Sequence, residues 1–268
     1  ETYGVLALWL LRITGRTKRS VIIHRFQGTW LTFYLRQNKI FKLLGNFEFI
    51  FALALRANLC IMTDDGTQGN AIYKIIHKRM DNFKFWINGV DFSLDDNPRE
   101  RLRKELSLDN HVLILTVSRL ERWKRIDRVI DVVSLFCNKY PDIQISYIVV
   151  GEGKEKDRLI AYAKQKNVFN IIKFVGAITN EKVYQYYRAA DIFFSLYDLS
   201  NVGNPLLEAI REHKVIFTLS NGDTGKWISH KKNGFIYNPV DKNTISSIVN
   251  DLYNIIIDSS LKKNIEEN

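Results

Sequence analysis

The chain has little cysteine and no cluster of metal-binding residue types. Among its 268 residues, cysteine occurs only at Cys60 and Cys137, far apart and outside any Cys-x-x-Cys pair or Cys/His group. A small disulfide-linked domain and a zinc finger are therefore not indicated. This cysteine usage fits a reducing compartment, and we expect a cytoplasmic protein that holds no metal.

The chain also lacks a long hydrophobic run. Residues 5–11 are apolar but too few to cross a bilayer, and the longer segment 47–62 is interrupted by Arg56 and Asn58. We therefore expect no transmembrane helix. An initiator methionine and the basic start of a signal peptide are missing at Glu1, so we expect a chain cut from a longer protein whose first domain is incomplete.

What the chain has is an ordinary globular composition with an excess of positive charge. It is 46% hydrophobic, and 39 Lys and Arg outnumber 29 Asp and Glu for a net charge of +10. Phosphorylated small molecules, nucleic acid and anionic membranes would all suit this charge. A nucleic-acid module is disfavoured, because an RNP-like aromatic pattern, a zinc finger and a helix-turn-helix are all lacking. We expect weak, peripheral contact with anionic lipid on the inner face of the membrane.

From residue 111 onward, short apolar runs alternate with segments of helical periodicity. Residues 112–117 (VLILTV) and 145–150 (ISYIVV) are continuous β-rich runs, each followed by a loop and an amphipathic segment. Further buried strands are predicted at 171–175, 192–196, 215–218 and 235–237. This order predicts a mainly parallel, Rossmann-like α/β sheet.

The region before residue 91 is less regular. Strands are predicted at 20–24, 59–63 and 84–87, and a helix at 47–57. The turn Asn88-Gly89 and the following Val90-Asp91 are typical of a hinge. We therefore predict a partial first domain over residues 1–91 and a second domain over residues 92–268.

A basic loop follows the predicted strand 112–117. Its cations include Arg119, whose planar guanidinium forms a fork, and Lys124, a compact charge. In open α/β sheets, ligands bind at the carboxyl edge of the strands, so these groups could hold a diphosphate and neutralise a departing one. A solvated basic loop explains the same residues equally well.

A second group follows strand 192–196. Asn204 is predicted as the N-cap of a helix with Pro205 at its first position, and Gly203 would let the backbone approach a ligand. The helix start would face a phosphate. Glu208, one turn into the helix, could accept hydrogen bonds from ribose, although an exposed helix glutamate is the simpler reading of that residue alone.

Taken in order along the chain, these segments resemble the donor domain of retaining family 4 glycosyltransferases (glycosyl transferases group 1). The matching series runs Ser118-Arg119-Leu120 with Lys124, Val150-Gly151-Glu152-Gly153, Phe174-Val175-Gly176, Ala190-Asp191-Ile192, and Gly203, Pro205 and Glu208-Ala209, preceded by Asn88-Gly89-Val90-Asp91. The likeness covers roughly residues 20–257 and is firmest after residue 88.

The resemblance implies an α/β GT-B fold with two Rossmann-like domains, the first incomplete here, and transfer of a sugar from a nucleotide diphosphate sugar with retention. It implies no metal or other cofactor, and an acceptor that is a glycan, a lipid-linked sugar or a small molecule. Arg119, Lys124 and Glu208 would act in catalysis. The donor site would comprise Arg119, Lys124, Gly151, Val175, Gly176, Ser200, Asn201, Gly203, Asn204, Pro205, Leu206 and Glu208.

Two features depart from the family pattern. The family usually carries two glutamates with seven residues between them; Glu208 is the second, and Ser200 stands at the first. Asp198, Asn201 or Asn204 could replace the missing contact to the sugar. The family's glycine-rich first loop is also absent. A catalytically silent nucleotide-sugar-binding protein is therefore the alternative to an enzyme.

In the first domain, three residues are candidates for the acceptor side. His24 and Gly28 lie in the region where the family often has a histidine-glycine pair, and Asp65 follows the predicted strand 59–63. A structural histidine and a plain Asp-Gly turn are the alternatives.

Overall fold

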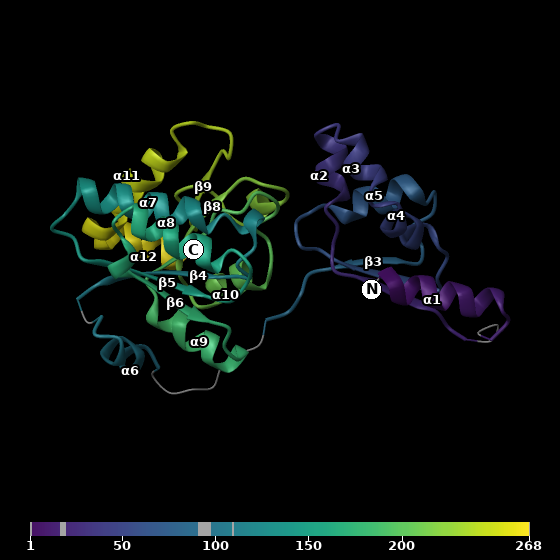
Figure 1. Ribbon diagram of the computed structural model, residues 1–268, viewed down its shortest axis with the longest axis horizontal. Helices are drawn as coiled ribbons and strands as arrows, with labels where there is room; N and C mark the ends of the chain where they lie inside the picture. The colour runs from purple at the N-terminus through teal and green to yellow at the C-terminus, as the bar shows by residue number, and fades with distance from the viewer. Residues whose placement is uncertain (1, 17–19, 91–97, 109, 268) are drawn as a thin grey trace. The chain divides into compact units, whose positions relative to one another are not determined.

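The computed structural model describes residues 2–16, 20–90, 98–108 and 110–267, which form two compact units, residues 1–89 and 90–268. The predicted boundary between residues 91 and 92 lies outside the described residues. Each unit is an α/β structure around a parallel sheet (Figure 1). Among the described residues, no helix is both long and apolar enough to cross a membrane.

The first unit contains a three-stranded parallel sheet in the order β1-β2-β3. Its own core gathers buried side chains such as Phe26, Leu53 and Met62. In chain order the elements are α1 (Thr2–Ile13), β1 (Ile23–Phe26), α2 (Leu31–Arg36), α3 (Ile40–Leu44), α4 (Phe47–Ala54), β2 (Leu59–Thr63), α5 (Gly69–Ile76) and β3 (Phe83–Trp86).

The second unit contains six parallel strands in the order β6-β5-β4-β7-β8-β9. In chain order the helices and strands are α6 (Pro98–Glu105), β4 (Val112–Val117), α7 (Ile126–Lys139), β5 (Ile145–Val150), α8 (Lys156–Gln165), β6 (Ile172–Gly176), α9 (Asn180–Ala189), β7 (Ile192–Ser195), α10 (Asn204–Arg211), β8 (Val215–Leu219), β9 (Phe235–Tyr237), α11 (Thr244–Ile257) and α12 (Ser259–Glu267). The predicted strand-helix alternation is confirmed.

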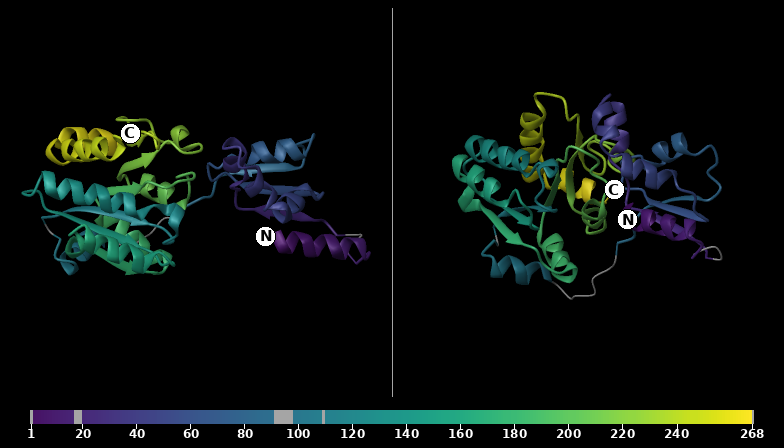
Figure 2. Two further views of the ribbon diagram at one scale, coloured as in Figure 1. Left: turned by 45° about the horizontal axis from the view of Figure 1, so that its top comes forward. Right: turned by 45° about the vertical axis from the view of Figure 1, so that its right-hand side comes forward.

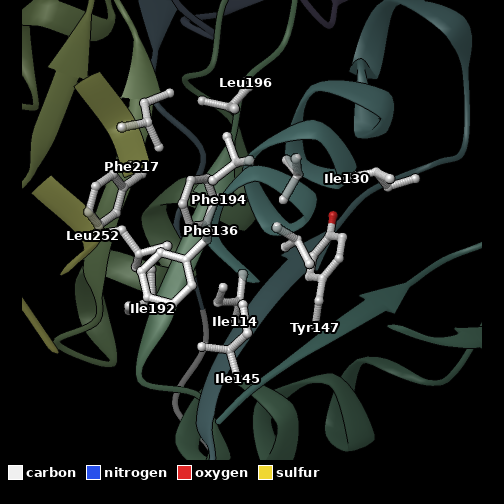
Figure 3. Close-up of a cluster of buried hydrophobic side chains, with 14 of the residues drawn as sticks. Ile114, Ile130, Phe136, Ile145, Tyr147, Ile192, Phe194, Leu196, Phe217 and Leu252 are labelled. Carbon is white, nitrogen blue, oxygen red and sulfur yellow. The ribbon is translucent and has the colours of Figure 1, made fainter. Parts of the chain in front are cut away.

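Helices cover both faces of this second sheet (Figure 2). Side chains of α7, α8, α11 and α12 pack on one face, and those of α6, α9 and α10 on the other. On the first face the rings of Phe194 and Phe217 (Figure 3) stack with centroids 4.9 Å apart. The ring of Phe217 also stacks on that of Phe235, with centroids 4.6 Å apart. Burial on both faces explains why these strands are continuous apolar runs.

Asp191, the residue before β7, links the amino end of that strand to two helices. Its buried carboxylate pairs with Arg99 of α6 at 2.7 Å, Arg103 at 3.1 Å and Lys262 of α12 at 3.3 Å, and accepts the Leu113 N–H at 2.9 Å. Burial acts to raise the pKa of this carboxyl, but Lys262, the Leu113 N–H and Arg99 outweigh it and lower the pKa to about 2. The Ala190-Asp191-Ile192 motif therefore ties helices to the sheet.

Candidate functional site

The strand order of the second sheet indicates where a candidate ligand site would lie. From β4 the chain continues outward through β5 and β6, then returns to add β7, β8 and β9 on the other side. The direction reverses between β4 and β7, which are paired at Ile114 with Ile192 and Leu115 with Phe193. Loops diverge at such a point and leave a crevice at the carboxyl ends of the strands. Both predicted groups of site residues follow these two strands.

The loop after β4 is held by backbone contacts with the loop after β5. The Leu120 N–H donates to the Glu152 carbonyl at 2.9 Å, and the Glu155 N–H donates to the Leu120 carbonyl at 3.0 Å. The Leu120 side chain is fully buried, whereas Arg119 beside it is exposed. The loop is thus anchored by Leu120 and presents the Arg119 guanidinium to solvent at the sheet edge, as a phosphate ligand would require.

Gly151 makes this close approach possible. It has a φ of +132°, and a Cβ there would lie 1.9 Å from the Ser118 carbonyl oxygen; a Cβ on Gly153 would lie 2.4 Å from that of Leu120. Gly176 ends β6 at a φ of +89°, and its carbonyl accepts the Gly151 N–H at 2.9 Å. These glycines have a structural reason to be glycine. The predicted donor contacts of Gly151, Val175 and Gly176 stay predictions.

Lys124 joins the loop after β4 to the loop after β7. Its Nζ lies 3.8 Å from the ring centroid of Tyr197 and 4.1 Å from that of Trp123. The two rings meet edge to face, and the Asp198 N–H donates to the Trp123 carbonyl at 2.9 Å. The cation-π contacts hold the Lys124 ammonium between the loops that follow β4 and β7. Sequence reasoning missed both aromatics, although Trp123 adjoins Lys124 and Tyr197 follows the strand.

Asp198, one of the residues that could replace the missing glutamate, is ion-paired within the protein. Its carboxylate is 2.7 Å from a guanidinium nitrogen of Arg128 and 3.2 Å from one of Arg125. Arg125 also pairs with Asp127 at 3.1 Å. Arg125 of the loop and Arg128 of α7 are therefore neutralised within the protein, whereas Arg119 is exposed to solvent.

Asn201 holds the loop after β7 in place. The side chain is buried; its Oδ1 accepts the Tyr197 N–H at 3.0 Å, and its Nδ2 donates to the Leu219 carbonyl at 3.1 Å. Its own N–H donates to Thr224 Oγ1 at 3.3 Å. The side-chain amide is hydrogen-bonded at both ends within the protein, and the predicted donor contact of Asn201 stays a prediction.

Helix α10 begins one residue earlier than predicted. Gly203 is the cap residue and Asn204 the first helical residue, so the prediction of Asn204 as N-cap is wrong. The N–H groups of Leu206 and Leu207 both donate to the Gly203 carbonyl, and Pro205 has no N–H. The Leu206 side chain is buried in the core. Fewer backbone donors therefore point outward than the sequence suggested, and the cations carry more of any anion binding.

Gly203 is unlike the other glycines of the site. Its φ of −164° is extended, which any residue adopts, and a Cβ there would meet only Pro205 Cδ at 3.8 Å. Neither backbone conformation nor packing within the described protein requires a glycine. The open space over Gly203 is what a ligand lying against the start of α10 would need.

Ser200 and Glu208 lie before and after this helix start. Ser200 is half-buried, and its Oγ accepts the Val202 N–H at 3.0 Å, which closes a local turn. Burial raises the pKa of the Glu208 carboxyl, against the opposing effects of the Tyr187 hydroxyl and Arg211. Glu208 is thus a partly desolvated acceptor and not an ordinary exposed helix glutamate.

In the first unit, the structure brings Gly28 and Asp65 together. A Cβ on Gly28, which has a φ of +87°, would lie 2.2 Å from Asp65 Oδ2, so only glycine leaves room for that carboxylate. Burial raises the pKa of the Asp65 carboxyl, against the hydrogen bonds from Thr67. Both residues follow the carboxyl ends of their strands.

His24 does not join this pair. It is buried within β1 and lines a separate pocket of about 330 Å³ with side chains of α1 and residues that precede β1 and β2, including Trp9, Arg12 and Arg56. Burial, and then the nearby Arg12, lower the pKa of His24. The three predicted acceptor-side residues therefore do not form one site.

Among the residues that the structure describes, no three His, Cys, Asp or Glu side chains are grouped to hold a metal ion. A sequence model described as glycosyl transferases group 1 matches residues 98–268, which is most of the second unit and more than half of the chain. The chain belongs to this family. The match contains the basic loop, the glycine turns and the start of α10.

Curated relatives resemble about two thirds of the chain. The chain is 23% identical over 168 residues to alpha-monoglucosyldiacylglycerol synthase of Acholeplasma laidlawii, covering 62% of this chain and 42% of the relative. It is 25% identical over 178 residues to 2-deoxystreptamine N-acetyl-D-glucosaminyltransferase of Niallia circulans, covering 66% and 44%. The chain spans less than half the length of each relative it matches.

Solved structures extend the likeness to both units. Anabaena Alr3699/HepE, in complex with UDP-glucose, aligns with a TM-score of 0.77 at 19% identity, covering all of this chain and 70% of that one. WaaG, a glycosyltransferase involved in lipopolysaccharide biosynthesis, aligns with a TM-score of 0.67 at 19% identity, covering 78% and 56%. The predicted α/β GT-B fold with two Rossmann-like, mainly parallel sheets is confirmed.

Proposed function

We propose that this chain is the donor-binding part of a retaining, metal-independent family 4 glycosyltransferase. The observation that carries the proposal is the contact of Lys124 with Tyr197, because it brings the basic loop after β4 to the segment that leads into α10. Arg119 and Lys124 would bind the diphosphate and stabilise it as it leaves. Glu208 would accept hydrogen bonds from the ribose, and the sugar would lie over Gly203.

The proposed donor is a nucleotide diphosphate sugar. UDP and UDP-glucose are bound in solved structures of the same fold, so uridine nucleotides are the first to test. The acceptor is proposed to be a glycan, a lipid-linked sugar or a small molecule. The relatives' names include a glucosyldiacylglycerol and 2-deoxystreptamine, which supports the lipid and small-molecule cases. We propose a cytoplasmic location with peripheral contact to anionic lipid.

A thermal-shift screen of the full-length protein against nucleosides, nucleoside diphosphates and their sugars tests the donor. Ligand at a hundredfold excess over its Kd stabilises the native state by about 2.7 kcal/mol, a rise in the melting temperature of roughly 5–10 °C for a unit of this size. Nucleosides alone should give much less. A screen in which no diphosphate raises the melting temperature would contradict the proposed donor site.

Ser200 supports a second candidate, a silent nucleotide-sugar-binding protein. Its hydroxyl closes a local turn, and it stands where the family pattern that the sequence resembles has a glutamate. An assay of sugar transfer and donor hydrolysis by the full-length protein separates the two candidates. Binding without either reaction, across a panel of acceptors, would favour the silent protein.

A further inference from the structure

Segment 196–198, which follows β7, is bonded to the loop after β4 and to the start of α7. The Asp198 N–H donates to the Trp123 carbonyl at 2.9 Å, and the Leu196 carbonyl accepts a hydrogen bond from the Arg128 guanidinium at 2.8 Å. The Asp198 carboxylate lies 2.7 Å from another nitrogen of that guanidinium. Because main chain and side chains both take part, these bonds fix the position of one loop relative to the other.

Arg125, the residue after Lys124, has a left-handed backbone. Its φ is +48° and its ψ is +45°, a conformation that is uncommon for residues other than glycine. Its guanidinium pairs with Asp127 at 3.1 Å and with Asp198 at 3.2 Å, and these ion pairs hold the turn from which α7 begins. The backbone that carries Lys124 is therefore fixed at its carboxyl side.

The Tyr197 side chain has a fixed position beside the end of β4. It is 3% exposed, and its hydroxyl donates to the carbonyl of Val117, the last residue of β4, at 3.3 Å. Its N–H donates to Asn201 Oδ1 at 3.0 Å, and its carbonyl accepts from Asn221 Nδ2 at 2.6 Å. Burial of the ring and these hydrogen bonds leave Tyr197 little freedom to move.

The Lys124 ammonium lies against this ring and a second one. Its Nζ is 3.8 Å from the ring centroid of Tyr197 and 4.1 Å from that of Trp123, inside the limit of about 6 Å for a cation-π contact. A lysine side chain that moves freely loses its rotamer freedom when it binds a phosphate, which weakens binding. Rings that already hold Nζ remove part of that loss before a ligand arrives.

We propose that Tyr197 is a positioning residue for Lys124, and that its ring holds the ammonium where a diphosphate between the loops after β4 and β7 requires a cation. Trp123 supports the same ammonium with a second ring. The inference rests on the proposed function, because it requires Lys124 to bind the diphosphate. Tyr197 itself needs no contact with the ligand, and the ring carries the effect, not the hydroxyl.

Calorimetry on the full-length protein tests the proposal. UDP, GDP, ADP and TDP are each compared with the matching nucleoside, and the diphosphate that binds the wild type most tightly is used for the variants. Lys124→Ala should weaken diphosphate binding at least about tenfold. Tyr197→Leu should weaken it roughly three- to tenfold, the range expected when one long side chain must be ordered on binding. Tyr197→Phe keeps the ring and should stay within about twofold of wild type.

A double-mutant cycle separates positioning from a general effect on the fold. Tyr197→Leu should change diphosphate binding by less than about twofold when Lys124→Ala is already present, because the ring acts through the ammonium. Trp123→Leu removes the other ring and gives a second cycle with Lys124→Ala if Tyr197→Leu does not fold. Tyr253→Leu on α11 removes a ring that stacks on Tyr140 at 4.1 Å, and this matched control should bind diphosphate as the wild type does.

Three results would overturn the positioning role alone. They are additive losses in both cycles, equal losses of nucleoside and diphosphate binding in Tyr197→Leu, and tighter diphosphate binding by Tyr197→Leu, which would show that the ring draws the ammonium away from the ligand. A wild type that binds none of the four diphosphates, or a Lys124→Ala variant that binds diphosphate as the wild type does, would overturn this inference together with the proposed diphosphate site.

Discussion

At the scale of single residues, Arg119 and Lys124 should contribute to the binding of a nucleoside diphosphate and not to the binding of the nucleoside alone. Arg119→Ala and Lys124→Ala should each weaken binding of a nucleoside diphosphate by about 1.5–3 kcal/mol, the range for hydrogen bonds to charged groups, and leave nucleoside binding nearly unchanged. Calorimetry measures both. Lys263→Ala, a loss of exposed charge on α12, is the matched control. Equal losses for nucleoside and diphosphate would remove both residues from the phosphate site.

Ser200 and Glu208 should contribute unequally to transfer. Ser200→Ala removes a neutral hydrogen bond, so the transfer rate should fall by the factor that corresponds to about 0.5–1.5 kcal/mol. Glu208→Ala should cost more, since a charged acceptor for the ribose is lost. If the wild type is silent, Ser200→Glu should introduce activity. Transfer that is indifferent to both alanine substitutions would show that the sugar site is misplaced.

The raised pKa of the Glu208 carboxyl predicts how nucleotide affinity changes with pH. Its pKa is raised by burial, and ribose hydroxyls donate more strongly to the ionised carboxylate than to the neutral acid, so nucleotide affinity should rise as pH increases through that pKa. Nucleotide Kd measured between about pH 4.5 and pH 7 should fall, and Glu208→Gln should flatten the dependence. A profile unchanged by Glu208→Gln would assign the pH dependence to the phosphates of the ligand.

At the scale of elements, two glycines beside the site should respond differently to substitution: Gly203 at the start of α10 and Gly151 after β5. Gly203→Val should leave the free energy of unfolding within about 0.5 kcal/mol of wild type, because the extended backbone and open space accept a side chain. It should nevertheless block the donor and weaken its binding at least about tenfold. Gly151→Ala should instead lower the free energy of unfolding, since its Cβ would collide with the Ser118 carbonyl. Urea unfolding and calorimetry on both variants check the contrast; normal donor affinity in Gly203→Val would refute it.

The ion-pair cluster of Asp191 with Arg99, Arg103 and Lys262 should stabilise the packing of α6 and α12 on the sheet. The folded-state pKa of about 2 lies below the ordinary 3.8, so the cluster stabilises the fold at pH above 3.8 and loses that contribution as pH falls through about 2. The shift corresponds to about 2 kcal/mol. Asp191→Asn should lower the free energy of unfolding by at least this amount near neutral pH and by less near pH 3. The exposed Asp142→Asn is the control, and equal effects at both pH values would contradict the linkage.

Strands were predictable where burial dictates composition. β2, β4, β5 and β9 have the predicted bounds, because a strand covered on both faces must be a continuous apolar run. Helix α3 was not predicted, and it buries no side chain that would impose a helical period. The sequence also placed the site residues at the sheet edge. It could not show that Asp198 pairs with Arg128 or that Asn201 binds Leu219, since these partners come from distant segments.

At the scale of the whole molecule, the two units should be separable. Each has its own core, and the buried residues of the second unit's two clusters lie between Leu102 and Ile265. Residues 90–268 produced alone should unfold in one cooperative transition and bind nucleotide diphosphate, because every proposed donor residue lies within them. Circular dichroism and calorimetry measure both. A piece that binds only when residues 1–89 are added would place donor contacts in the first unit.

The pairing of β4 with β7 governs how the second unit forms during synthesis. Ile114 and Ile192 are neighbours in the sheet but 78 residues apart in the chain, so loop-closure entropy must be lost before their contact is gained. Contacts of this kind slow folding into the millisecond-to-second range. Until β7 has left the ribosome, β4 is the open edge of a half-sheet, and its sequence VLILTV carries no charge to discourage pairing with another chain. Strand β4, beside which the finished sheet reverses direction, is thus open during synthesis to pairing with another chain.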